Sequence, residues 1–372
     1  MKPQHKKLYQ QLLIGLLIVV PCLLVSIFTF VLSLRPWPRS LDYEFLNLLM
    51  VLKGGIPAHE NILIIEIDPD SERKMHESYG PQWRQYHPKV IDHLKEAKLI
   101  AFDLAFYGDQ PAYDKPLAAK MCETKNIVIA TARENQETQS IPHVLLVNTK
   151  PGHVELEHTL ISRNVVGVKP ITLKEESEAI EQGLAPNYYE PSFLFRMLEI
   201  INNDFHSEHH KRRRITGVET KPNTIQIGLT EIPVDSNEMM YIRHLASRED
   251  FNRLNYYDVY SGNFDKSLIN NRKIVIIGLI RKATDYHWTA YGKQHGVTLQ
   301  ALALNTVMQR NHVYFPREFL YFLYLLACGL TYQVCSLKLE RKCFFVVILP
   351  VLILSLVTAY SGFWIPLPSM PM

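Results

Sequence analysis

A long uncharged stretch near the N-terminus constrains this chain more than any other feature. No charged residue occurs between Leu8 and Leu34, and the apolar core runs from Leu12 to Leu32. A helix needs about 20 consecutive apolar residues to cross the hydrocarbon core of a bilayer. A cleaved signal peptide has a shorter apolar region and a small-residue exit, whereas this stretch exits through the RPWPR sequence at 35–39. The sequence therefore predicts an uncleaved membrane span at residues 9–34.

Two further apolar stretches near the C-terminus predict a tight pair of spans, at residues 318–337 and 343–361, with a charged turn at 338–342 between them. Positive charge precedes the first span and fills this turn, at Lys2, Lys6, Lys7, Lys338, Arg341 and Lys342. The positive-inside rule then places residues 1–8 and the turn in the cytoplasm. Residues 35–317 are expected on the outside.

This topology leaves a tail, residues 362–372, on the external side. Either the chain ends there naturally, or a fourth span and whatever follows it are missing. In both cases the predicted location is the cell inner (plasma) membrane, with the main domain extracytoplasmic.

The external region alternates apolar runs of strand length with helical patterns. The expected strands cover 61–67, 99–102 and 126–130, and the expected helices begin near Ser71, His87 and Asp114. Parallel strands need crossovers of helical length, which this βαβαβ order supplies. We therefore predict an α/β fold, with a mainly parallel sheet flanked by helices on both faces.

The stretch from Asn270 to Asn311 predicts a further strand and helix. Residues 273–277 are expected to form a buried strand that stops at Gly278, and the helix follows from Val297. The loop between them carries Asp285 and His287 and closes at His295 and Gly296. Loops at the carboxyl ends of parallel strands usually hold the ligands of open α/β sheets.

The middle of the external region is less regular. The pattern predicts short strands at 144–147 and 165–168, a helix at 191–201, a hairpin of 224–229 with 238–242, and helical turns within 251–260 and 264–269.

Three acids end or follow predicted parallel strands: Asp68, Asp103 and Asp285. Because parallel strands end at the same rim of a sheet, these carboxylates are expected near one another. Two interpretations are open. Each Asp caps the helix or loop that follows it, which is a common role for Asp after a strand. Alternatively, the three line a pocket for a divalent cation or for a cationic or polar ligand.

Two histidines of the same loop, His287 and His295, are candidate ligand-binding residues, or hydrogen-bonded structural residues. Trp83 and Arg84 precede an expected helix, where they would cover a ligand or pack in the core. No cofactor or metal can be assigned from these patterns.

Motifs of the common enzyme classes are absent from the sequence. It contains no HExxH, no GxSxG, no Walker-type loop and no pair of CxxC motifs, so nothing supports catalysis. With 40 Lys and Arg against 37 Asp and Glu, the net charge is +3, which gives no reason to expect nucleic acid. Two alternatives to a binding protein stay open: an external metal-dependent hydrolase or transferase using the acidic rim, and a structural partner of another membrane protein.

The ordered set of segments resembles the type-2 CHASE domain, an extracytoplasmic sensory module associated with cyclases and histidine kinases. The resemblance covers about residues 40–365 and rests on NILIIEIDPDS, PQWRQYHPKVIDHL, KLIAFDLAFYGDQPAYDKPLA, EIPVDSNEMMYIRH, DVYSGNF, NRKIVIIGLIRKATDYHWTAYG and HGVTLQALALNTVMQRN. The resemblance implies that Gly296 corresponds to the glycine that precedes the last external helix in the family. It also implies that Asp68, Asp103 and Asp285 correspond to the acidic residues at the strand ends of the family.

This resemblance implies a sensor that binds a small ligand outside and signals through its membrane helices. Members of the family usually carry a cytoplasmic kinase or nucleotide cyclase, and this sequence departs from them because it includes no such output domain. The expected partners are the lipid bilayer, a small-molecule ligand, a separate kinase or cyclase, and a second copy of the chain in a homodimer.

Overall fold

The computed structural model describes residues 47, 50–51, 54–131, 141–147, 149–154, 156–158, 165–169, 171–173, 189–202, 223–227, 230–234, 239–245, 251–281 and 285–312. Nearly all of them belong to one compact unit, Met50–Val313. The predicted spans at 9–34, 318–337 and 343–361 lie outside the described residues. Within the described ranges, no helix combines the length and apolar character needed to cross a bilayer.

A six-stranded sheet forms the centre of the unit, and all of its pairings are parallel. The strands follow the order β12 (Asn252–Asn255), β1 (Ile62–Ile67), β13 (Ile274–Leu279), β2 (Leu99–Ala105), β3 (Ile127–Thr131) and β4 (Lys150–His153). The predicted α/β class with a mainly parallel sheet is confirmed. β13 comes late in the chain but inserts between β1 and β2.

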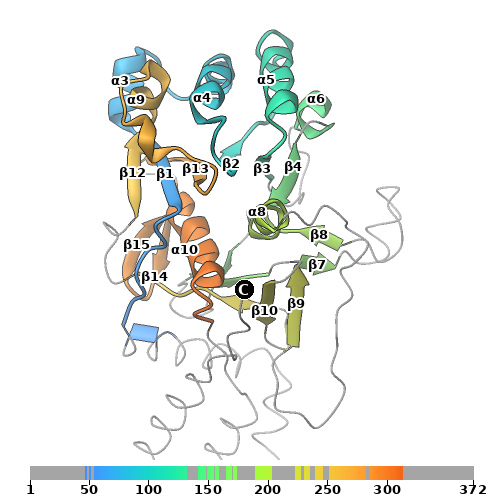
Figure 1. Cartoon of the computed structure of the whole chain (residues 1–372), viewed down its shortest axis with the longest axis vertical. Coiled ribbons are helices and arrows are strands. Elements are labelled where there is room, and N and C mark those ends of the chain that lie inside the picture. The colour runs from blue at the N-terminus through green and yellow to red at the C-terminus, as the bar shows by residue number, and fades with distance from the viewer. Residues whose placement is uncertain are drawn as a thin grey trace, which may run out of the picture. The chain divides into compact units, whose positions relative to one another are not determined.

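Helices cover both faces of this sheet (Figure 1). Side chains alternate along β1, so that Leu63 and Ile65 enter one apolar core while Ile62 and Ile64 enter the other. The first core packs under α3 (Pro69–Met75), η1 (Pro81–Gln85), α4 (His87–Leu94), α5 (Pro111–Thr124), α6 (His143–Val147) and α9 (Tyr256–Ser261). The second packs under α8 (Phe193–Ile201) and α10 (Gly296–Met308).

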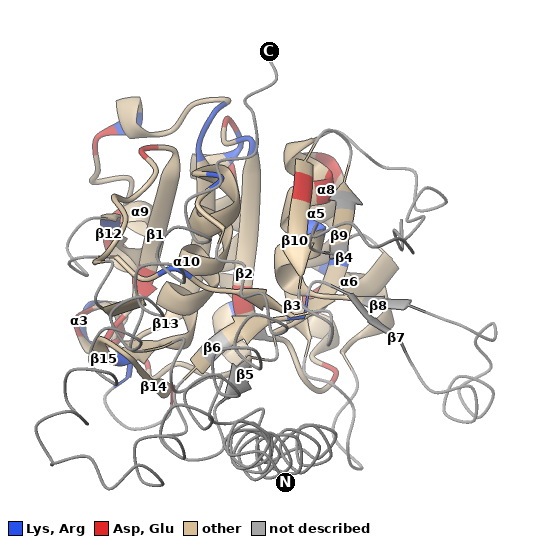
Figure 2. Ribbon diagram, turned by 90° about the horizontal axis from the view of Figure 1, so that it is seen from below, with Lys and Arg blue, Asp and Glu red and all other residues tan. Residues whose placement is uncertain are grey.

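α10 lies against the central strands β1, β13 and β2 (Figure 1 and Figure 2). Almost every residue of this helix is buried, because the sheet, α8 and the short sheets cover it on several sides. The short sheets pair β10 (Thr230–Val234) with β9 (Asn223–Ile227), β11 (Met240–Tyr241) with β6 (Val165–Val168) and β5 (Glu157–His158), β14 (Tyr286–Thr289) with β15 (Gly292–His295), and β7 (Ile171–Leu173) with β8 (Tyr189–Pro191). A 3-10 turn, η4 (Lys266–Leu268), precedes β13.

Several predicted elements differ from the structure. The expected strand at 144–147 is the helix α6, because only Leu145 of this apolar run is buried and it packs against α5. The strand β13 does not stop at Gly278 but continues through it, since the absent Cβ lets α10 approach. The expected hairpin partner of 224–229 was wrong: β9 pairs with β10, while β11 pairs with β6.

Several strands were missed, among them β12 and the strands of the β14 and β15 hairpin. β12 contains Arg253 and two asparagines, so its composition gives no strand signal, and it forms only because β1 offers an edge. The loop expected between β13 and α10 contains the β14 and β15 hairpin, whose polar strands hide its pattern.

Candidate functional site

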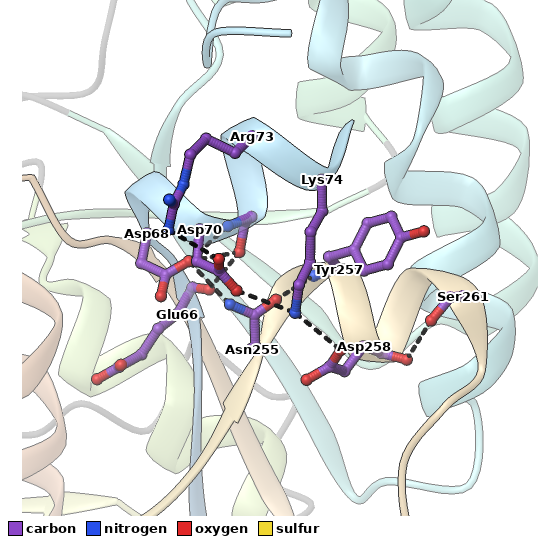
Figure 3. A network of polar contacts seen from close by, with 10 residues as sticks. Glu66, Asp68, Asp70, Arg73, Lys74, Asn255, Tyr257, Asp258 and Ser261 are labelled. Atoms are coloured by element: carbon purple, nitrogen blue, oxygen red, sulfur yellow. Dashed lines mark hydrogen bonds and ion pairs between the residues drawn. The ribbon is translucent and has the colours of Figure 1, made fainter. Parts of the chain in front are cut away.

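Asp68 is the N-cap of α3. Its Oδ1 accepts hydrogen bonds from the Ser71 backbone N–H at 2.7 Å, the Ser71 hydroxyl at 2.8 Å and the Asn255 amide at 2.8 Å (Figure 3). The cap satisfies a helix N–H that has no partner inside the helix. The contacts of Asp68 thus favour the capping interpretation.

The same network joins α3 to α9. Lys74 lies 2.9 Å from an oxygen of Asp70 and 3.6 Å from an oxygen of Asp258 (Figure 3). Through Asn255, Asp68 also fixes the start of α9, because the Asn255 side chain accepts from the Tyr257 N–H. Among the described residues, no interaction links Asp68 to Asp103 or Asp285, so the three predicted acids do not form one cluster.

Asp103 and Asp285 do come together, beside the N-terminus of α10. Asp103 of β2 lies in register with Gly278 of β13. Its side chain is on the same face of β2 as those of Ala101 and Leu99. α10 covers that face. Asp285 reaches the start of the same helix, where its Oδ2 accepts from the Gly296 N–H at 3.0 Å. A carboxylate at this position is stabilised by the helix dipole.

Two glycines make this approach possible. A Cβ on Gly296 would lie 2.7 Å from both carboxylate oxygens of Asp285. A Cβ on Gly278 would lie 2.4 Å from the Cβ of Val297, the second residue of α10. Real Cβ atoms essentially never come this close to other heavy atoms, so both glycines keep the helix terminus against the sheet.

Asp103 has an unusual protonation equilibrium. Burial, reinforced by the negative charge of Asp285 and opposed by His287, raises the pKa of Asp103 from 3.8 to about 7. Within the described residues, no hydrogen bond or ion pair holds its carboxyl group. A proton or another cation would therefore relieve the repulsion between the two carboxylates.

The two predicted histidines have different surroundings. His287 Nε2 lies 3.5 Å from Asp285 Oδ1, so this histidine belongs to the acidic cluster. His295 is the N-cap residue of α10, is buried, and stacks its ring at 4.2 Å from that of Tyr286. Its position favours a structural role.

Trp83 and Arg84 do not cover an open site, because both are buried. Arg84 donates to the carbonyl oxygens of Tyr107 and Gly108, at 2.6 Å and 2.7 Å, and forms a 2.7 Å ion pair with Asp114. These contacts hold the loop that follows Asp103.

Residues that follow β1 and β13 were also missed by the sequence reasoning. Glu72 accepts from the Tyr79 N–H at 2.9 Å and from Arg281, which follows β13. Tyr79 is electrostatically coupled to Asp103, and burial raises the pKa of its hydroxyl. The only sequence signal for these residues was that Arg281 follows the end of a predicted strand, as the three predicted acids do.

Within the ranges that the structure describes, no group of three or more His, Cys, Asp or Glu residues is arranged to hold a metal ion. The cluster of Asp103, Asp285 and His287 is therefore best described as an acidic pair with one imidazole. Its chemistry suits proton binding and the recognition of a cation.

Replacing Asp103 by asparagine should change how stability depends on pH. A folded-state pKa of about 7 means that the folded chain binds more protons than the unfolded chain above pH 3.8. The contribution of Asp103 to the free energy of unfolding therefore falls as pH rises to about 7 and is constant beyond it. At about pH 8 the free energy of unfolding of the variant should exceed that of the wild type by roughly 2 kcal/mol. This value allows for the partial exposure of the carboxyl group.

The quantity to measure is the difference between the two pH profiles. Buried histidines act in the opposite sense below their ordinary pKa of 6.5, because burial lowers the pKa of His87 to about 3 and those of His244 and His312 to about 4. Their contributions cancel in the difference. A difference profile that stays flat between about pH 4 and pH 8 would contradict the assignment.

A comparison with family models identifies the family of this chain. A family model described as the CHASE2 domain matches residues 21–332, which include the whole of the described unit. The searches of curated proteins and of solved structures find no match. CHASE2 domains are extracellular sensory domains. With most of its length matched, this chain belongs to the CHASE2 domain family.

Proposed function

We propose that this chain is a membrane-anchored extracytoplasmic sensor that recognises a small cationic ligand or a proton at Asp103 and Asp285. The observation that carries the proposal is that Asp285 accepts the first N–H of α10 and lies close enough to the buried Asp103 to help raise its pKa. The pair is electrostatically unfavourable when both groups are ionised, and a bound cation removes that cost. Ligand binding would therefore favour a closer arrangement of the pair.

The helix α10 is suited to carry such a change. At one end Gly296 holds Asp285. Near the other end, the Asn305 amide donates to Pro57 at 3.0 Å and the Thr306 hydroxyl accepts from the Arg243 N–H at 2.9 Å. The predicted span at 318–337 begins six residues beyond His312. A displacement of the helix N-terminus would reach the span through one buried rigid element.

A ligand shifts the balance between two states only by its different affinity for them. In this proposal the states differ in the separation of Asp103 and Asp285, so affinity for a cation differs directly between them. The signal then passes to a cytoplasmic kinase or cyclase, either as a separate protein or in a longer form of this chain. A homodimer would give the spans a partner against which to tilt or rotate.

Disulfide crosslinking in the full chain tests the signalling step. Cysteines placed near Arg35 and Glu318, in a background without the native cysteines, should crosslink differently at about pH 5 and about pH 8.5, since protonation of Asp103 is the simplest stimulus. Asp103→Asn should hold the low-pH pattern at both values.

Asp92→Asn is the matched control, because Asp92 is exposed and pairs only with Lys120 among its described contacts. It should leave the pH response intact. An identical crosslinking pattern of the wild type at the two pH values, or a pH response of Asp103→Asn as large as that of the wild type, would refute signalling through this pair.

A further inference from the structure

The β14 and β15 hairpin exposes an aromatic and basic face. Tyr286 and Trp288 are two residues apart on β14 and therefore share a face; their relative exposures are 38% and 53%. Lys293 lies opposite Trp288, with its Nζ 4.8 Å from the Trp288 ring and 5.9 Å from the Tyr286 ring. Exposed apolar side chains that lie next to one another, unlike ones scattered singly, can mark an interaction surface.

This face lies on the side of the unit where the described chain begins. The Tyr291 hydroxyl, in the hairpin turn, donates to the Met50 carbonyl at 2.7 Å. Val51 follows directly and is 42% exposed. Of the four large apolar side chains that are exposed among the described residues, three thus belong to this region, and the fourth is Val147 of α6.

The other end of the described chain leaves from the same side. The Ile56 N–H donates to His244, whose ring lies 5.3 Å from that of Tyr291. The adjacent Arg243 N–H donates to Thr306, in the last turns of α10. The start of the unit, the hairpin turn and the end of α10 are therefore neighbours.

Chain length limits how far this side can lie from the predicted span. Glu318, where that span begins, is six positions after His312. Fully extended, six residues cover at most about 20 Å. Tryptophan and tyrosine concentrate at the level of lipid headgroups. Lysine adds attraction to anionic lipids from the same depth.

We propose that the hairpin face formed by Tyr286, Trp288 and Lys293, with Val51 beside it, docks into the headgroup layer of the membrane that anchors this chain. The inference rests on the anchoring in the proposed function. It adds a contact that couples the bilayer to the site, because the hairpin starts directly after Asp285 and ends directly before α10. A lipid surface suits this face better than a folded partner, because the face offers two rings and one ammonium group beside the chain end.

Tryptophan quenching in the full chain tests this proposal. The sequence has four tryptophans, and W37F/W364F leaves only Trp83, which is fully buried, and Trp288. In nanodiscs of phosphatidylcholine and phosphatidylglycerol, replacing the phosphatidylcholine by a form brominated high on its acyl chains should quench the emission. Adding W288F should abolish most of this quenching.

The control variant adds both W288F and Val147→Trp to the same background. It carries an exposed tryptophan on α6, which packs against α5 and β4 and not against the hairpin, and should not be quenched. Quenching that survives W288F, or that is equally strong at position 147, overturns the docking proposal. Failure of the chain to resist carbonate extraction from membranes would instead overturn the anchoring and the docking with it.

Discussion

Replacing Asp114 by asparagine is expected to lower the free energy of unfolding by about 3–5 kcal/mol, the usual result of breaking a buried ion pair from one side. Asp114 and Arg84 are both almost completely buried, and their ion pair measures 2.7 Å. The other carboxylate oxygen of Asp114 accepts from the Gln110 N–H at 2.6 Å. The asparagine leaves the guanidinium charge buried and uncompensated.

The loss can be measured by urea unfolding of the full chain in nanodiscs, followed by tryptophan emission. Asp92→Asn makes the same chemical change at an exposed carboxylate and should leave the urea midpoint where it is. The double variant R84M/D114L should recover much of the loss, because it removes both charges together. Equal losses in the single and double variants would contradict the uncompensated guanidinium charge as the cause of the loss.

Replacing Gly278 by alanine is expected to cost about 3 kcal/mol, at the upper end of overpacking effects. The new methyl group would lie 2.4 Å from the Val297 Cβ and 2.5 Å from its Cγ2. Neither the central strand β13 nor the buried helix α10 can shift without disturbing several neighbours. A displaced α10 would also carry Gly296 away from Asp285.

This second variant therefore has two readouts in the same titrations. The free energy of unfolding should fall, and the contribution of Asp103 to its pH dependence should shrink because Asp285 moves away. Gly80→Ala is the matched control. Gly80 has an extended backbone, with φ of −172°, and the close contact of its added Cβ is with the flexible end of Gln82. A Gly278→Ala variant as stable as Gly80→Ala would show that α10 is not packed tightly on β13.

Local sequence patterns predicted most of the regular elements correctly. β1, β3, β6, α8 and α10 lie within a few residues of their predicted positions, because each is an apolar run with a clear period and a turn or cap signal at its ends. The cap at Asp68 followed from its place between a strand and a proline. The membrane spans stay predictions, because they lie outside the described residues.

The candidate site was predicted only in part. Sequence reasoning grouped Asp68 with Asp103 and Asp285 because all three end parallel strands. In the structure, Asp68 turns toward α3 and Asn255, whereas Asp103 lies on the face that α10 covers. The direction of a side chain depends on strand register and on which helix covers that face, and neither can be read from a single sequence.

What the sequence determined by itself was local: the periodicities that select strand or helix, and the apolar stretches that predict the spans. Strand order, and with it the site, was decided by tertiary structure. β13 inserts between β1 and β2 although some 170 residues separate it from β2 in the chain. For loops of this length the entropic cost of closure changes little with the exact number of residues. The packing of side chains against α10 therefore selects which strands lie beside β13. That packing brings Asp103 and Asp285 to the same helix terminus.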